Sequence, residues 1–146
     1  MIDRRRVDEI FRNLDNSLNL LRKLKKLPEK ELTEDALTLG AAKYYLQVSV
    51  ECCIDISNHI IAANVWRRPE SMSDAFVVLA ENGIVDSEFL PTLKRMAQFR
   101  NRLVHLYWDV DAITIYRILQ ENLGDFERFM NDILNYFSDE INPAEK

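Results

Sequence analysis

One short segment in the C-terminal half carries the side chains best suited to chemistry. It reads Arg100-Asn101-Arg102-Leu103-Val104-His105-Leu106-Tyr107 and brings a guanidinium, an amide, an imidazole and a phenol together. Imidazole moves protons near neutral pH, and a guanidinium holds a phosphoryl group through two parallel hydrogen bonds. The combination favours the hypothesis of RNA cleavage without a metal, with Arg100 and His105 as the acting groups.

The composition indicates one all-α domain spanning residues 1–146. Three glycines and four prolines among 146 residues supply little turn chemistry, which favours helices over sheets. Cys52 and Cys53 are adjacent within an apolar run, a spacing that matches neither a metal knuckle nor a secreted disulfide framework. No stretch resembles a signal peptide or a membrane span. We therefore expect a soluble protein in the reducing cytoplasm, without membrane partners.

Charge and motif content exclude several other classes. The net charge of −5 argues against a surface built for bulk nucleic-acid binding. The first 30 residues are nevertheless basic, which suits either a solvated helix face or an edge that contacts RNA or a partner. The glycine-rich loops of nucleotide hydrolases and dinucleotide-binding proteins and the serine-hydrolase elbow do not occur.

Hydrophobic periodicity predicts an antiparallel bundle of about five helices. Pro28 ends the first helix, Thr33 is a plausible N-cap for the second, and Gly83 suits the left-handed residue after the third. The third begins near Ser71 or Ser73, and the fifth begins at Asp111. The expected ranges are 2–27, 34–66, 73–82, Asp86 or Ser87 to His105 with Pro91 in the first turn, and 111–139.

Arg100 falls on an apolar stripe of the fourth predicted helix, and Tyr107 shares this stripe if the helix continues that far. The stripe consists of Leu93, Ala97, Arg100, Val104 and Tyr107. A charge at such a position is costly without a partner. Arg100 therefore either faces a cleft that receives an anion, meets a second subunit, or pairs with an internal carboxylate such as Asp55 or Glu51.

A single regular helix does not bring the two candidate groups together. At about 100° per residue, Arg100 and His105 point roughly 140° apart, whereas Asn101 and His105 share a face. Either the helix unwinds near His105, or two copies of the segment meet across a two-fold axis. We favour the second arrangement. In a third interpretation, His105 only caps its own helix.

The second predicted helix carries its own polar residues within an apolar run: Glu51, Asp55, Asn58 and His59. Buried polar groups need partners, so Asp55, Asn58 and His59 are candidates for a network that holds Arg100 or for nucleotide contacts. The Glu-x-x-His pattern of di-iron bundles is missing, and we expect no metal site. Cys52 and Cys53 are expected to be buried structural residues rather than nucleophiles.

These residues resemble a known family. The segment from Arg100 to Tyr107 fits the Arg-x4-His-x-Tyr signature of the HepT-like toxins, which belong to the HEPN superfamily of helical nucleases. Three further stretches look like other parts of that family and extend the resemblance over most of the chain: Tyr44-Tyr45-Leu46-Gln47-Val48-Ser49-Val50-Glu51, Asp55-Ile56-Ser57-Asn58-His59-Ile60-Ile61 and Tyr107-Trp108-Asp109-Val110-Asp111.

The resemblance implies a homodimeric, metal-independent endoribonuclease toxin without a cofactor, dimerising through the helices that carry the motif. Its partner would be a minimal nucleotidyltransferase antitoxin. Arg100 and His105 would be catalytic, Asn101 would support them, and Tyr107 would receive AMP from the antitoxin. The alternatives are a non-catalytic nucleotide-binding or scaffold subunit of a nucleotidyltransferase complex, or a purely structural bundle in which Arg100 is satisfied internally.

Overall fold

The computed structural model describes residues 2–141, and within them the chain is entirely helical, as predicted. Seven α-helices and one 3-10 turn, η1, make up this described part. Their bounds are α1 (Arg4–Lys25), α2 (Glu29–Glu34), α3 (Ala36–Ala63), α4 (Met72–Glu81), α5 (Leu90–His105), η1 (Tyr107–Asp109), α6 (Ala112–Glu121) and α7 (Leu123–Ile141).

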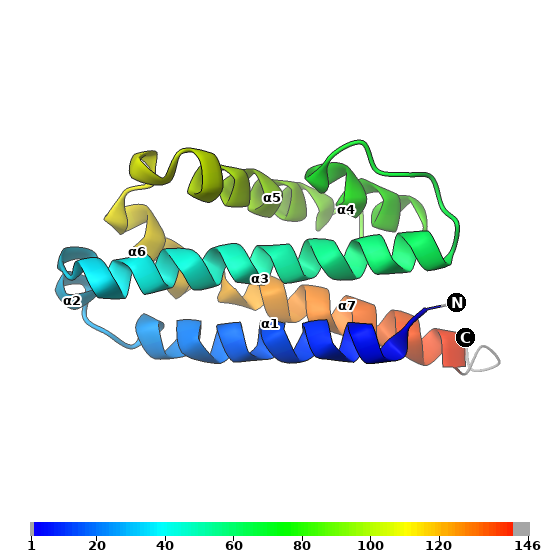
Figure 1. Cartoon of the computed structure of the whole chain (residues 1–146), viewed down its shortest axis with the longest axis horizontal. Coiled ribbons are helices and arrows are strands. Elements are labelled where there is room, and N and C mark those ends of the chain that lie inside the picture. Colours follow the sequence, from blue (N-terminus) through cyan, green and yellow to red (C-terminus); the bar gives the residue numbers. More distant parts are fainter. Residues whose placement is uncertain (1, 142–146) are drawn as a thin grey trace.

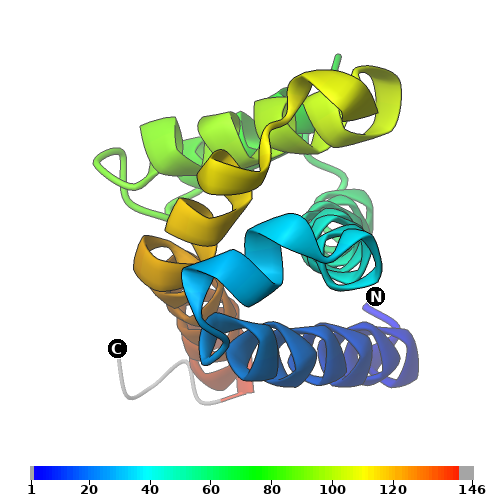
Figure 2. The same ribbon diagram turned by 90° about the vertical axis from the view of Figure 1, so that its left-hand side faces the viewer.

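Helix α3 occupies the middle of the bundle. Helices α1 and α7 run along one side of it, and α4 and α5 along the other (Figure 1). Viewed from the end, α6 descends from the α5 side to α7, and α2 crosses between the ends of α1 and α3 (Figure 2). This central position explains why α3 is apolar on several faces, with successive residues such as Cys52, Cys53 and Ile54 all buried.

The predicted apolar stripes form the core. In α1 the stripe is buried at Val7, Ile10, Leu14, Leu18 and Leu21. The stripe predicted over 111–139 is also buried at almost every position: Ile115, Leu119, Leu123, Phe126, Ile133 and Phe137. Removing such surface from water supplies the main driving force for folding, so these two stripes hold α1, α6 and α7 against α3.

Several predicted helix ends are confirmed. The Ser71 hydroxyl accepts a hydrogen bond from the Asp74 amide at 3.1 Å and caps α4. Gly83 follows the end of α4 with φ +75°, the left-handed conformation expected there. The Asp111 carboxylate accepts from the Thr114 amide at 2.7 Å and caps α6. Pro91 lies in the first turn of α5.

Two expectations about the helices are wrong. Thr33 does not cap the long central helix, because it lies inside α2; Asp35 caps α3 by accepting from the Leu37 amide at 3.1 Å. The predicted helix 111–139 is two helices separated at Asn122. In addition, α5 begins at Leu90, later than the expected start at Asp86 or Ser87.

The end of α3 is a left-handed turn formed without glycine. The Val65 amide donates to the Ala62 carbonyl and the Trp66 amide to the Ile61 carbonyl, the two hydrogen bonds of a Schellman motif. Val65 has φ +54° and is 89% exposed. A β-branched residue is strained in this conformation.

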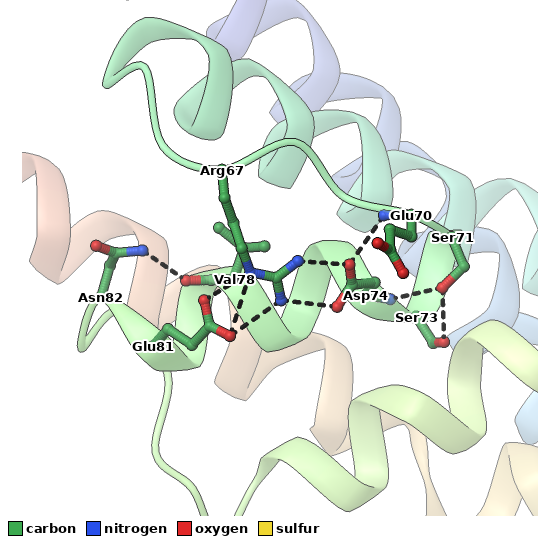
Figure 3. A network of polar contacts seen from close by, with 8 residues as sticks. All are labelled: Arg67, Glu70, Ser71, Ser73, Asp74, Val78, Glu81 and Asn82. Atoms are coloured by element: carbon green, nitrogen blue, oxygen red, sulfur yellow. Dashed lines mark hydrogen bonds and ion pairs between the residues drawn. The ribbon is translucent and has the colours of Figure 1, made fainter.

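An ion-pair network fastens the connection between α3 and α4 (Figure 3). Arg67 donates two hydrogen bonds to the Asp74 carboxylate, each 2.8 Å long, and its Nε donates to Glu81 at 2.9 Å. Asp74 also accepts from the Glu70 amide. These bonds lower the pKa of Asp74 to about 2, with the Arg67 side chain as the largest cause.

Candidate functional site

Arg100 is held by a carboxylate of the central helix. Its Nε and Nη2 atoms each lie 2.9 Å from Glu51 Oε1, and its Nη1 donates to Asn101 Oδ1 at 3.2 Å. Gln47, one turn earlier in α3, donates to the same Glu51 oxygen at 3.1 Å. The Arg100 side chain is 16% exposed and that of Glu51 34%. Of the two carboxylates that the sequence offered as partners, Glu51 is therefore the one used.

The pairing leaves part of the guanidinium available. Arginine has five N–H donors. Nε donates one hydrogen bond to Glu51, Nη1 donates one to Asn101, and Nη2 lies within ion-pair distance of the same Glu51 oxygen. The other N–H groups of the two Nη atoms have no hydrogen-bond partner within residues 2–139. Glu51 thus fixes one edge of Arg100, and the opposite end of the group keeps the donors that bind an anion.

His105 is the last residue of α5 and is exposed. Leu106, which follows it, leaves the helical conformation with φ −131° and ψ 44°, and η1 begins one residue later. The helix therefore ends after His105 and stays regular from Arg100 to His105, so the unwinding that would bring the two side chains together does not occur. In the part of the chain that the structure describes, the imidazole makes no hydrogen bond, so His105 does not cap its own helix.

Tyr107 is not an extension of the α5 stripe, because α5 ends before it; it packs against α3 instead. Lys43 Nζ donates to the Tyr107 carbonyl at 3.3 Å and lies 4.1 Å from the centre of the phenol ring. A β-carbon at Gly40 would come within 3.7 Å of the Tyr107 hydroxyl. Burial lowers the pKa of Lys43, and the negative charge of Asp111 opposes this effect.

The sequence analysis missed Lys43 and Gly40. A signal for Lys43 was present, since it is the only charged residue in the stretch 36–50. A lysine alone in an apolar helix needs a partner for its ammonium group. Here the partners are a backbone carbonyl and an aromatic ring 64 residues further along the chain.

Large apolar side chains lie exposed beside the motif. Trp108 is 91% exposed and packs edge-on against Tyr107, with the ring centres 5.4 Å apart. We call the exposed residues of this end of α5 and of η1 the apolar rim: Val104, Leu106, Tyr107 and Trp108. Four exposed apolar side chains within one short segment indicate a contact with another macromolecule.

The predicted network of Asp55, Asn58 and His59 around Arg100 is wrong. Asp55 and Asn58 are exposed and His59 is half-buried, and none of the three bonds to Arg100, whose partners are Glu51 and Asn101. Partial burial raises the pKa of Asp55, although the nearby charge of Arg6 in α1 lowers it. Asp55 therefore lies within electrostatic reach of α1, one turn along α3 from Glu51.

The remaining polar and sulfur groups offer little further chemistry. Cys52 and Cys53 are buried as expected, and burial raises the pKa of the Cys52 thiol to about 11. Within residues 2–139, no three His, Cys, Asp or Glu side chains gather closely enough to hold a metal ion. None of the described helices is both long and apolar enough to cross a membrane.

The fold and the motif together define a class, a helical bundle with an Arg-x4-His segment at the end of one helix. Comparison with known proteins makes the assignment specific. The sequence model of the family described as "Ribonuclease HepT-like" matches residues 14–133. The chain belongs to this HepT-like family.

Named relatives agree with this assignment. The chain is 36% identical over 88 residues to the mRNA nuclease HepT of Shewanella oneidensis, a match that covers 60% of this chain and 66% of that protein, just under two thirds of its length. It is similar in structure to a tri-AMPylated HEPN toxin from the same organism, solved in complex with an MNT antitoxin. The TM-score is 0.82 at 26% identity, covering 88% of this chain and 96% of the toxin.

A second solved structure supports the fold alone. The cytosolic protein YutE from Bacillus subtilis, described as having unknown function, superimposes with a TM-score of 0.84. The alignment covers 97% of this chain and 95% of YutE at 21% identity. The all-helical architecture is that of the HEPN toxins.

Proposed function

We propose that this protein is a metal-independent endoribonuclease, the toxin of a toxin–antitoxin pair. The observation that carries the proposal is Arg100, a largely buried arginine that Glu51 anchors while N–H donors remain free. It lies on the same helix end as His105, which is exposed and makes no hydrogen bond within residues 2–139. The relatives support the activity, because one is an mRNA nuclease and another a tRNA nuclease, from Aphanizomenon flos-aquae.

The proposed reaction is an in-line attack of a ribose 2′-hydroxyl on the adjacent phosphate. The 2′-oxygen forms a new P–O bond, the bond to the 5′-oxygen breaks, and the products are a 2′,3′-cyclic phosphate and a 5′-hydroxyl. His105 exchanges protons with these oxygens. The free donors of Arg100 stabilise the additional negative charge on the phosphorane-like transition state, and Asn101 supports the guanidinium through its bond to Nη1.

A two-fold dimer completes this site. Arg100 turns inward to Glu51, whereas His105 lies at the exposed end of α5, so one chain alone does not place both groups on the same phosphate. Two copies that meet at their apolar rims bury this surface and bring two His105 and two Arg100 side chains to one groove. The exposed fractions of Trp108 and Leu106, 91% and 52%, support this arrangement.

The proposed partner is a minimal nucleotidyltransferase antitoxin that attaches AMP to Tyr107. Support comes from the Shewanella oneidensis toxin, which is tri-AMPylated and bound to an MNT antitoxin. In this chain Tyr107 is 36% exposed, while Lys43 holds its backbone carbonyl and its ring. An AMP group on the phenol adds a phosphate and a base next to the site, and the phosphate competes with RNA for Arg100.

A second candidate is a non-catalytic nucleotide-binding or scaffold subunit of the same complex. One observation favours it: the Glu51 carboxylate already neutralises the charge of Arg100 within the fold. In that case the motif serves only as the target of modification. The two functions differ in whether the isolated chain cuts RNA.

The test uses the purified chain, free of nucleotidyltransferase, with a short RNA in excess chelator. Cleavage that leaves a 2′,3′-cyclic phosphate, and that stops when one 2′-deoxy residue replaces the nucleotide before the cut, is the expected result. Products with a 5′-phosphate, or a requirement for added metal, contradict the mechanism. No cleavage of any RNA favours the scaffold function.

A further inference from the structure

A cleft lies along α5, on a different side of the helix from the contact between Arg100 and Glu51. Its volume is about 520 Å³, and its walls come from α3, α5, α6 and α7. Clefts of this size fit small organic ligands. Buried Leu46, Val50 and Phe126 contribute to the apolar lining, and Phe99 is half-buried at the cleft.

Two arginines stand at this cleft without a carboxylate partner. Arg95 donates to the Thr92 hydroxyl at 3.1 Å, and Arg102 donates weakly to the Asp109 carbonyl at 3.4 Å. Neither forms an ion pair within residues 2–139, in contrast to Arg100 and Arg67. Since Arg95 and Arg102 are both exposed, their charges are available to an anion that enters the cleft.

The spacing along α5 arranges these groups in one row. Arg95, Phe99 and Arg102 lie at i, i+4 and i+7, so they share a face within about 60°. The two arginines are about 10 Å apart along the axis, with the aromatic ring between them. His105 follows Arg102 by three residues and neighbours the same row, whereas Arg100 points about 140° away from Arg95.

The break between α6 and α7 supplies polar groups on the opposite wall. Asn122 lies at the break, and its side-chain amide donates to Asp125 at 3.5 Å. Both residues line the cleft. An amide and a carboxylate offer hydrogen bonds to the edge of a nucleobase, and aromatic rings such as Phe99 provide the stacking surface that single-stranded nucleic acids use.

We propose that this cleft binds one nucleotide of a single-stranded RNA, outside the reacting phosphate, and leads the strand past His105. The base lies against Phe99, and the flanking phosphates contact Arg95 and Arg102. The inference rests on the proposed nuclease function, for which it supplies a substrate-binding subsite. It also explains how a chain with a net charge of −5 holds RNA, because two arginines without an ion-pair partner within residues 2–139 line the path of the strand.

The experiment measures the binding of a labelled single-stranded RNA of about 12 nucleotides to His105→Ala protein by fluorescence anisotropy. Phe99→Leu preserves most of the packing volume and removes the stacking surface. We expect it to weaken binding about 5- to 100-fold. Arg95→Gln combined with Arg102→Gln removes two phosphate contacts, which should reduce the slope of log K against log salt by about 1.4.

The chain offers a matched control at a second cleft of about 520 Å³, lined by Phe11 and Arg12 but also by Asp8 and Asp15. There, Phe11→Leu and Arg12→Gln make the same chemical changes beside carboxylates, and neither should alter RNA binding. Thermal melting of every variant establishes that the fold is retained. An oligonucleotide carrying 5-iodouridine should also crosslink to the segment that contains Phe99.

The outcomes separate this inference from the proposed function. Binding is compared in the His105→Ala background, and cleavage is compared with His105 present. If the Phe99 and arginine variants bind RNA as the His105→Ala protein does, and cleave it as the chain with His105 does, the subsite is wrong and the nuclease stands. If binding depends on the cleft but no RNA is cut, the subsite stands and the nuclease is wrong. If no RNA binds, both are wrong. If the Phe99 and arginine variants lose antitoxin binding while their RNA binding is unchanged, the cleft belongs to the protein partner and the proposal is overturned.

Discussion

Glu51→Gln is the most informative single substitution at the site, because it removes the charge that anchors Arg100 and keeps the shape of the side chain. Arg100 donates to Glu51 through Nε at 2.9 Å, its Nη2 lies 2.9 Å from the same oxygen, and its side chain is 16% exposed. A charge-assisted hydrogen bond contributes about 1.5–3 kcal/mol. Since the Glu51 side chain is one third exposed, solvent screening brings the total loss down to about 1–2 kcal/mol.

That loss corresponds to a decrease of about 3–8 °C in melting temperature for a chain of this length. The effect on catalysis should be larger than this stability loss suggests, because Arg100 no longer presents its free donors in a fixed direction. We expect kcat/KM for RNA cleavage to fall about 10- to 100-fold, the usual consequence of a misplacement near 1 Å. The fall should appear mainly in kcat, since the lost contact orients the group that stabilises the transition state.

Asp74→Asn is the matched control. It also removes a carboxylate from an arginine, here Arg67 in the network of Figure 3, but this network fastens the connection between α3 and α4. We expect a comparable decrease in melting temperature with unchanged cleavage. Equal losses of cleavage in both variants, or unaltered cleavage by Glu51→Gln at a temperature where it is folded, would refute the positioning role of Glu51.

Four further predictions concern assembly, control and stability. Trp108→Asp should turn the dimer into a monomer in sedimentation analysis, because it places a charge on the apolar rim; an unchanged dimer places the interface elsewhere. Tyr107→Phe should block AMP addition by the nucleotidyltransferase and ATP, as seen in the intact mass, and modification of another residue contradicts this assignment. The pKa of Asp74 is lowered from 3.8 to about 2, so its contribution to stability is complete above pH 4 and disappears as the pH falls through 2. Between pH 5 and 2, the free energy of unfolding should therefore fall more steeply for the unmodified chain than for Asp74→Asn. Val65→Gly should increase the free energy of unfolding by about 0.5–1 kcal/mol, because glycine relieves the strain at φ +54°. The melting temperature should therefore rise, and a lower melting temperature excludes this strain.

Periodicity predicted the bundle because the long stripes are continuous in the sequence. It did not reveal the break at Asn122, since Ile115, Leu119 and Leu123 keep their phase across it and remain buried. The apolar pattern is the same for one helix or two. The local signal was the pair Asn122 and Gly124, which disfavours a helix interior.

The short helix α2 was missed for a different reason. Six residues are too few to form a stable helix alone. Leu32, which is fully buried, fixes this segment against the bundle. The sequence pointed to Thr33 as the N-cap of the central helix; because α2 forms, Thr33 lies inside it and Asp35 caps α3.

At the site, the sequence identified the motif and the need for a partner to Arg100. It did not decide between Glu51 and Asp55, because these residues lie one turn apart on α3. The choice depends on how far α5 is shifted along α3, which follows from the packing of Leu93 and Ala97 in the core. The contact between Lys43 and Tyr107 could not be predicted from the sequence either, because it joins residues 64 positions apart.

The central claim is that Arg100 and His105 carry out RNA cleavage. The most direct test is the single-turnover rate of cleavage, in excess chelator, for the unmodified chain and for Arg100→Ala and His105→Ala prepared identically. We predict that each variant is slower by about two to four orders of magnitude while circular dichroism and sedimentation stay the same. Undiminished cleavage by both variants would contradict the account and assign the activity to other residues or to a contaminant.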